Sequence, residues 1–370
     1  MEYVKLGSNN VSRLGFGCMR LPENNTGIDY DEALRMAEYA INNGINYFDT
    51  AYVYHSGNSE TFVRKAIEKF GRDKIFVADK LPMFNVRTAE DFQKYLDEQL
   101  ERLGTDYIDY YLFHCLGTRY FNMMKEFNYK DFIKKNKENG KIRHIGFSFH
   151  DNLDSFKEII DDYNWDFCQI QLNYLDVDYQ AGLSGYEYAT EREIPVIVME
   201  PIRGGELANI PTPIREIFDT CSLKNYSNAE IALKFVGNLE NSKVILSGMH
   251  AMEELEENIK LFNDNLINTL NTDEKIVYAL ARRKFYNYKF INCTGCDYCK
   301  ENCPSRIPIS EIFLKYNSDV KEPSWANSGW YKKLNANADH CIGCGACEST
   351  CPQQLKIVEN LQIVHEHFND

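Results

Sequence analysis

Residues 45–54 read INYFDTAYVY, an apolar run that gives way to polar side chains. Ile45 to Phe48 has the length and composition of a buried strand, and Asp49 and Tyr54 follow where that strand would meet its loop. A free phenol has a pKa of about 10 and is a poor acid near neutral pH. Tyr54 therefore needs a nearby cation that stabilises its phenolate before it can take part in proton transfer.

Two later strand candidates end in groups that suit such chemistry. Lys80 ends residues 75–80, and His114 ends residues 110–114. In a barrel of alternating strands and helices these strand ends face the same side. Each residue alone is commonly a solvated strand end, but the joint pattern predicts an active site in which Asp49 holds Lys80 charged. Lys80 would lower the pKa of Tyr54, and His114 would hydrogen-bond a substrate oxygen.

These residues belong to a wider pattern that runs along the chain. It consists of Gly15-Phe16-Gly17, residues 49–60 (DTAYVYHSGNSE), Lys80, His114 and the segment from Gly248 onward. In this order the pattern resembles the aldo-keto reductase family from the start of the chain to about Phe285. The resemblance implies an eight-stranded barrel, a nicotinamide cofactor bound without a dinucleotide-binding fold, and a catalytic tetrad of Asp49, Tyr54, Lys80 and His114. In this tetrad Tyr54 would protonate the carbonyl oxygen as hydride reaches the carbonyl carbon.

Residues 1–270 alternate short apolar strands with amphipathic helices. Eight such strands predict parallel pairing and an α/β fold, the (β/α)8 TIM barrel. An open doubly wound sheet has the same pattern, but its dinucleotide fingerprint is missing, because residues 15–17 (GFG) run into residues 18–20 (CMR). Residues 4–14 read as a hairpin that would plug one barrel end. The predicted strands are 14–18, 45–48, 75–78, 107–113, 142–147, 167–171, 194–199 and 243–246.

The resemblance also implies where the nicotinamide cofactor binds. Ser148 and Gln169 match positions that hold the carboxamide, and Met199 stands where many members stack a tyrosine on the ring. A methionine can pack there through its polarizable sulfur. Little positive charge stands where a 2′-phosphate would bind, so we expect NADH to serve at least as well as NADPH. The remaining candidates are Arg203 for phosphate, with a solvated loop arginine as the alternative, and Gly248, Glu257 and Asn258 on the adenine side.

Most of the cysteines are concentrated near the end of the chain, where eight of the 12 lie between Cys293 and Cys351 inclusive. They form two runs of the pattern C-x-x-C-x-x-C-x-x-x-C-P, of which the first ends at Cys303-Pro304 and the second begins at Cys341. Such runs are typical of two-cluster ferredoxins, in which the fourth cysteine of each run binds the other cluster. We therefore predict two 4Fe-4S clusters. One would be held by Cys293, Cys296, Cys299 and Cys351, and the other by Cys341, Cys344, Cys347 and Cys303.

Zinc and disulfides are the alternatives for these cysteines. Structural zinc sites favour paired cysteines with a longer gap between the pairs, and disulfides need an oxidising compartment. A helical stretch at residues 309–316 predicts a small, mainly helical ferredoxin-like domain. We expect three segments: a barrel at 1–270, a connecting helix and linker at 271–290, with Asn271 as a helix cap, and the iron-sulfur domain at 291–370.

Composition narrows the partners. A net charge of −14 argues against nucleic acid and anionic membranes, because phosphate would be repelled. The start of the chain, MEYVK, has no basic region followed by an apolar core, and the apolar runs are too short to span a bilayer. We therefore expect a cytoplasmic protein with a small carbonyl or alcohol substrate.

The two parts imply different electron chemistry, because hydride carries two electrons and a 4Fe-4S cluster passes one at a time. A flavin is a candidate converter between them, and a redox protein is a candidate partner. The sequence predicts a nicotinamide-dependent oxidoreductase that uses the tetrad, with clusters that exchange electrons with that partner. The alternative is an electron-transfer protein whose barrel binds a cofactor without turning over a carbonyl.

Overall fold

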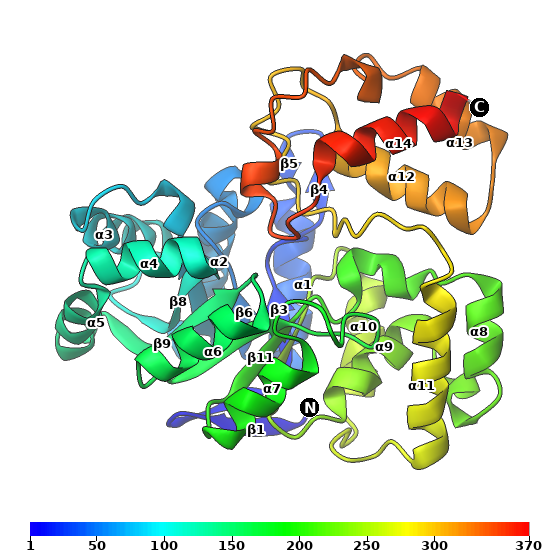
Figure 1. The fold of residues 1–370 in the computed structure, drawn as a ribbon. Helices are drawn as coiled ribbons and strands as arrows, with labels where there is room; N and C mark the ends of the chain where they lie inside the picture. Colours follow the sequence, from blue (N-terminus) through cyan, green and yellow to red (C-terminus); the bar gives the residue numbers. More distant parts are fainter. Residues whose placement is uncertain (370) are drawn as a thin grey trace. The chain divides into compact units, whose positions relative to one another are not determined.

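The computed structural model describes residues 1–369. One part of the chain is a closed barrel of eight parallel strands surrounded by helices (Figure 1). The strands follow one another around the barrel in sequence order, and the last pairs with the first. This confirms the predicted (β/α)8 barrel and excludes the open sheet. The barrel strands are β3 (Leu14–Gly17), β6 (Tyr47–Asp49), β7 (Phe76–Leu81), β8 (Ile108–Leu116), β9 (Ile142–Phe149), β10 (Phe167–Gln171), β11 (Val196–Met199) and β12 (Ser242–Ser247).

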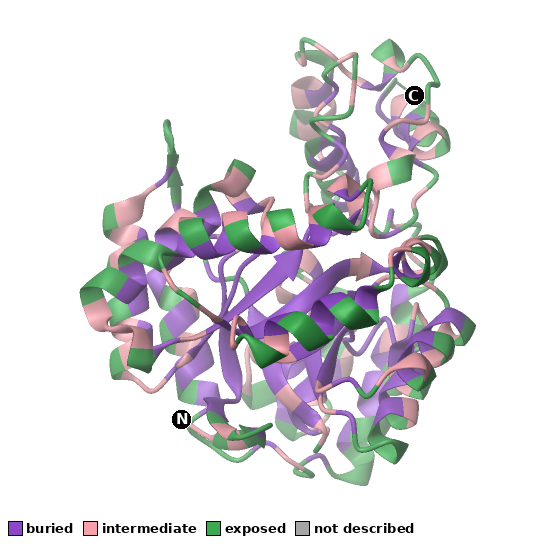
Figure 2. Ribbon diagram, turned by 90° about the vertical axis from the view of Figure 1, so that its left-hand side faces the viewer, coloured by how far each residue is buried: buried purple, intermediate pink, exposed green. Residues whose placement is uncertain are grey.

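The barrel interior is filled by every second residue of its strands, because successive side chains of a strand point to opposite faces. Tyr47, Ala78, Tyr110 and Phe167 belong to one fully buried interior cluster. In Figure 2 the strands are buried along their length, whereas the helices around them are buried on the inner side and exposed on the outer side. Parallel strands buried on both faces explain the continuous apolar runs in the sequence.

One end of the barrel is closed by the predicted hairpin, β1 (Tyr3–Leu6) and β2 (Asn9–Ser12). Leu6 and Val11 join the interior cluster. A second hairpin, β4 (Glu23–Asn24) with β5 (Gly27–Ile28), was not predicted, because two-residue strands leave no periodic pattern.

The helices of the barrel unit occupy the predicted places within one or two residues. In α1, for example, Asp29 caps the helix by accepting a hydrogen bond from the Glu32 N–H, and the buried face carries Ala33, Met36 and Ala37. Helix α4 was missed, because only two of its nine residues are buried. The helices are α1 (Tyr30–Asn42), α2 (Asn58–Phe70), α3 (Glu90–Leu103), α4 (Thr118–Glu126), α5 (Tyr129–Glu138), α6 (Leu153–Asp162), α7 (Gly182–Glu191) and α10 (Met252–Leu261).

The chain divides into two compact units. The barrel unit comprises Met1–Pro201 and Leu233–Thr269, and the second unit comprises Ile202–Ala232 and the chain from Leu270 onward. Helix α9 (Asn228–Gly237) begins in the second unit and ends in the first. The second unit is mainly helical, as predicted. Its helices are α8 (Thr212–Phe218), α11 (Thr272–Phe285), α12 (Ile309–Lys321), α13 (Trp325–Lys332) and α14 (Ile357–Asn369).

The second unit has its own core, in which Ile312, Phe313 and Val364 pack around the cysteine-rich loops. Asn271 and Glu274 form a capping box at the start of α11, as the sequence suggested. Residues 202–208 belong to this unit for a local reason. Gly204 has a φ of 62°, and a Cβ atom there would lie 2.3 Å from the Thr294 carbonyl oxygen in the first cysteine run. Glycine is needed where two backbones approach so closely.

No helix within residues 1–369 combines the length and the apolar character that a membrane crossing requires.

Candidate functional site

Strand alternation brings the predicted active-site residues to one end of the barrel interior. Asp49, Lys80 and His114 each lie two residues beyond an interior core residue, namely Tyr47, Ala78 and Leu112. The same relation holds for Gln169 and Met199, which follow Phe167 and Ile197. Ser148 is the register partner of Gln169 on the neighbouring strand. All six side chains therefore follow from one geometric rule.

Lys80 is fully buried and held at two points. Its Nζ lies 2.6 Å from Asp49 Oδ1 and donates a second hydrogen bond of 2.7 Å to the Thr50 carbonyl oxygen. Burial favours the neutral amine, but Asp49 and the Tyr54 phenol outweigh it, so the pKa of Lys80 is raised. Lys80 is therefore a buried ammonium group at neutral pH.

Tyr54 begins the short 3-10 helix η1 (Tyr54–Gly57), directly after the loop that follows β6. The Lys80 Nζ lies 4.8 Å from its ring centroid, and the His114 ring meets the Tyr54 ring edge to face at 6.1 Å. Burial raises the pKa of Tyr54, and Lys80 opposes this only in part. The net lowering expected from the sequence is thus not found, because desolvation outweighs the ammonium group. The phenol is protonated at neutral pH, which suits a proton donor.

His114 is neutral in this site. Burial lowers its pKa well below the ordinary value, and Lys80 acts in the same direction. A neutral imidazole can hydrogen-bond a carbonyl oxygen without adding a charge. The Phe84 ring packs 5.7 Å from His114 and was not predicted, because it lies on a loop, η3 (Met83–Asn85), without a periodic pattern. The Thr50 carbonyl was also missed, because main-chain acceptors leave no signal in a sequence.

The predicted nicotinamide contacts lie on adjacent strands. Ser148 Oγ accepts a hydrogen bond of 2.9 Å from the Cys115 N–H, and Gln169 Nε2 donates to the Met199 sulfur at 3.6 Å. Gln169 Oε1 is buried and accepts no hydrogen bond from residues 1–369. A buried acceptor without a donor suits a position that binds a carboxamide N–H. These residues therefore fit the cofactor that the resemblance implies.

The other predicted cofactor contacts have the following surroundings. Asn258 is buried and donates to Ser247 Oγ at 3.1 Å, Glu257 is half-buried, and Gly248 is exposed. Arg203 belongs to the second unit, in the 3-10 segment Arg203–Ala208. It is 4% exposed and pairs with Glu206 at 3.5 Å, so it is not the solvated loop arginine that was the alternative.

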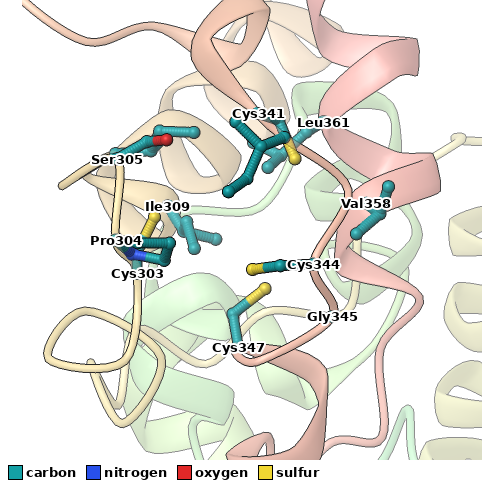
Figure 3. A pocket seen from close by; sticks show the side chains of 12 residues that line it. Cys303, Pro304, Ser305, Ile309, Cys341, Cys344, Gly345, Cys347, Val358 and Leu361 are labelled. Atoms are coloured by element: carbon teal, nitrogen blue, oxygen red, sulfur yellow. The ribbon is translucent and has the colours of Figure 1, made fainter.

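The eight cysteines of the second unit gather in two groups of four. Cys303, Cys341, Cys344 and Cys347 line one depression, and their sulfurs surround the same space (Figure 3). A second depression is lined by Cys293, Cys296, Cys299 and Cys351. The fourth cysteine of each run thus joins the first three of the other run. The structure brings together the two ligand sets that the spacing predicts.

The chemistry of these groups fits iron-sulfur clusters. Within the described residues, no three His, Cys, Asp or Glu side chains gather closely enough to hold a single metal ion, so zinc is not favoured. Gly295, Gly343 and Gly345 all have φ between 67° and 69°, a conformation that lets a short loop wrap around a cluster. Burial raises the pKa of Cys299 to about 12 and that of Cys347 to about 11, so bound iron must supply the charge that stabilises thiolates there.

Comparison with known proteins bears on both units. The model of the Aldo/keto reductase family matches residues 13–272, and that of the 4Fe-4S dicluster domain matches residues 289–355. The NADH-specific methylglyoxal reductase of Escherichia coli is 26% identical over 314 residues, which cover 72% of this chain and 95% of that protein. L-galactose dehydrogenase of Arabidopsis thaliana is 27% identical over 270 residues, covering 67% and 83%.

A shorter match and a solved structure add to these. Probable aldo-keto reductase 1 of Glycine max is 34% identical over 159 residues, which span 40% of this chain and 45% of that protein. The structure of an aldo-keto reductase from Bacillus halodurans in its holo form superposes with a TM-score of 0.63 at 24% identity, covering 76% of this chain and 96% of the other. This last likeness concerns the fold alone.

Proposed function

The chain belongs to the aldo/keto reductase family and carries a 4Fe-4S dicluster domain, and from this premise we propose that its barrel reduces a carbonyl compound, or oxidises the corresponding alcohol, with a nicotinamide cofactor. One observation carries the proposal. The buried ammonium group of Lys80 lies 2.6 Å from the Asp49 carboxylate and 4.8 Å from the Tyr54 ring centroid. A buried charge needs a partner, and this one has a phenol beside it as well.

The residues of the barrel have distinct roles in this reaction. The nicotinamide supplies the hydride when it is bound. Tyr54 donates its phenolic proton to the carbonyl oxygen, and Lys80 stabilises the phenolate that remains. Asp49 holds the Lys80 ammonium group in place, and neutral His114 orients the carbonyl oxygen by a hydrogen bond. Solvent returns the proton to Tyr54 after the alcohol leaves.

We propose that NADH is used at least as well as NADPH. In the segment expected on the adenine side, His250 pairs with Glu254 at 3.1 Å, and this pair offers no free cation to a 2′-phosphate. The E. coli relative named NADH-specific covers most of its own length in the match. Ser148, Gln169, Met199, Gly248, Glu257 and Asn258 are the proposed contacts, and Arg203 remains a prediction from the family resemblance. A large preference for NADPH in steady-state kinetics would refute the proposal.

We propose that the second unit holds two 4Fe-4S clusters and exchanges single electrons with a redox protein. The four cysteines of each group would bind one cluster as thiolates. Cys344 is exposed, whereas each cysteine of the other group is buried or half-buried. The cluster bound by Cys303, Cys341, Cys344 and Cys347 is therefore the one through which a partner would exchange electrons. A flavin stays the candidate for converting between single electrons and hydride.

The variant Tyr54→Phe tests the role of the barrel. We expect it to reduce kcat for aldehyde reduction with NADH by about 10²- to 10⁴-fold, the usual contribution of a positioned acid. Tyr52→Phe is a matched control, because that half-buried phenol donates to Glu98 at 3.0 Å and does not contact the tetrad. Unchanged reduction by Tyr54→Phe would contradict the mechanism. Absence of any carbonyl turnover in the wild type, with electron transfer from the reduced clusters, would favour a pure electron carrier.

Anaerobic purification tests the cofactors. Two 4Fe-4S clusters predict about eight iron and eight sulfide per chain and no stoichiometric zinc. Flavin is measured on the same sample, because a bound flavin would account for the electron conversion. Zinc in place of iron would overturn the cluster assignment.

A further inference from the structure

A buried layer of polar side chains lies behind Lys80, between the barrel sheet and its helices. Strand alternation turns Asp79 and Tyr111 away from the barrel interior, because their neighbours in each strand point inward. Glu60, in the first turn of α2, and Gln99, in α3, are buried in the same layer, as are Asp79 and Tyr111. Polar groups in such a place need hydrogen-bond partners.

Two of these side chains hold the main chain of Lys80. Asp79 Oδ1 accepts a hydrogen bond of 2.8 Å from the Lys80 N–H, and Gln99 Nε2 donates one of 3.1 Å to the Lys80 carbonyl oxygen. Gln99 is fixed in turn, because its Oε1 accepts a hydrogen bond of 2.7 Å from the Tyr111 hydroxyl. Lys80 is thus held at its main chain from this layer and at its ammonium group from the barrel interior.

The layer contains two carboxyl groups and one nearby arginine. Glu60 Oε2 lies 2.8 Å from Arg102 Nη1, which balances one negative charge. Glu60 Oε1 and Asp79 Oδ2 are buried and, within the described part of the chain, accept no hydrogen bond from an N–H group or a hydroxyl. The two carboxyl groups are in hydrogen-bonding contact with each other. Two acceptors can make that bond only when one of them carries a proton.

The charges place this proton on the Asp79 side. Burial and the neighbouring Glu60 raise the pKa of Asp79 well above its ordinary value. Burial also raises the pKa of Glu60, but Arg102 opposes that rise. Two buried carboxylates in contact cannot both ionise without a large electrostatic penalty.

We propose that Glu60 and Asp79 share one proton and that this pair positions Lys80 beside Tyr54. The proposal rests on the function proposed above and adds two positioning residues to it. With the shared proton the layer is neutral, because Glu60 is balanced by Arg102. Loss of the proton would place a second negative charge behind Lys80 and disfavour the Tyr54 phenolate.

Other groups facing the pair do not replace the proton. Arg102 from α3 already serves Glu60, and Lys80 from β7 directs its ammonium group to Asp49 in the barrel interior. Tyr111 from β8 donates to Gln99. Cys18, which follows β3, is a buried neutral thiol whose pKa burial raises.

Infrared spectroscopy tests the shared proton without any turnover. In the purified full-length protein at neutral pH, we expect a carboxylic-acid C=O band that shifts in D2O and is absent from Asp79→Asn. Asp109→Asn is the matched control, because Asp109 is also buried and pairs with Arg72 at 2.6 Å but has no second carboxyl group beside it. It should leave the band in place. A wild type without the band, or a band that survives in Asp79→Asn, would refute the shared proton.

Kinetics tests the positioning role. Asp79→Ala removes the acceptor of the Lys80 N–H, and we expect kcat to fall about 10- to 100-fold with little change in KM. Asp79→Asn should restore most of this loss, because its amide can donate to Glu60 and accept from Lys80 as the protonated acid does. Equal losses in both variants would refute positioning by the pair. If Asp79→Ala fails to fold, the pH profile decides instead: the wild type should lose kcat at high pH, as the shared proton leaves, and Asp79→Asn should not.

Because the infrared result does not depend on carbonyl reduction, it separates the two proposals. A band that obeys these expectations in a protein without carbonyl turnover would support the proton-sharing pair and contradict the proposed activity.

Discussion

Replacing Lys80 by methionine removes one partner of a fully buried ion pair and preserves most of the side-chain volume. Asp49 Oδ1 then loses its contact of 2.6 Å, and Asp49 Oδ2 has no hydrogen-bond partner within residues 1–369. Breaking a buried pair in this way typically costs about 3–5 kcal/mol. A second route gives a similar figure. Protonating a carboxyl group with an ordinary pKa near 4 at pH 7 costs about 1.4 kcal/mol for each of roughly three pH units, or about 4 kcal/mol.

The second route also fixes the pH dependence of Lys80→Met. Without Lys80, burial alone acts on Asp49 and raises its pKa, so the folded variant keeps a proton that the unfolded chain releases. The folded state then binds one more proton, and the free energy of unfolding falls by up to about 1.4 kcal/mol per pH unit as the pH rises. Between pH 6 and 8 the variant should therefore lose up to about 2.7 kcal/mol relative to the wild type.

The assay is anaerobic urea unfolding at pH 6, 7 and 8. Fluorescence of Trp165, which is buried in the barrel unit, and circular dichroism report the transition. The double variant Lys80→Met/Asp49→Asn is the control, because removing both charges should recover most of the stability and all of the pH dependence. A loss below about 1 kcal/mol at pH 7, or a loss that is the same at all three pH values, would refute the reasoning.

Three further substitutions test separate parts of the structure. His55→Ala removes the ring that accepts from the Leu21 N–H at 3.2 Å and pairs with Glu23 at 2.8 Å, so the turn after Tyr54 should become protease-sensitive and kcat should fall about tenfold; an unaltered digestion pattern would argue against this role. Gly345→Ala strains a position with φ of 68° by about 1–2 kcal/mol, and we expect faster bleaching of cluster absorption in air, which Gly329→Ala, in an open position, should not cause. Arg13→Met leaves the carbonyls of residues 237, 239 and 242 without their donor and should cost about 3 kcal/mol in urea unfolding, whereas the exposed Arg35→Met should cost less than about 1 kcal/mol.

Much of the barrel was predictable because its signals are local. Each of the eight strands is a short apolar run, and each is present within a few residues of its expected place. The hairpin β4–β5 and helix α4 were missed because short elements with few buried residues carry almost no periodic pattern. The grouping of residues 202–232 with the second unit was also not predicted. It follows from backbone contacts such as that of Gly204 with Thr294, which no residue pattern records.

The candidate site divides in the same way. The sequence indicated the tetrad and the cysteine sets, because residue type and spacing define them. It did not indicate the net pKa shift of Tyr54, since that shift depends on how completely the ring is buried. Nor did it indicate the pairing of Glu60 with Asp79, which are remote from each other in the chain and meet only where a helix covers a strand.

The sequence by itself thus determined the alternation of strands and helices, the polar residues at the strand ends and the two cysteine runs, because each is a pattern among neighbours in the chain. Only the tertiary structure decided which charges are buried together, which oxygens lack a donor and which thiols surround the same space. Those properties depend on desolvation and on distances between residues that are far apart in sequence, and both are set when the barrel closes and its helices pack against it.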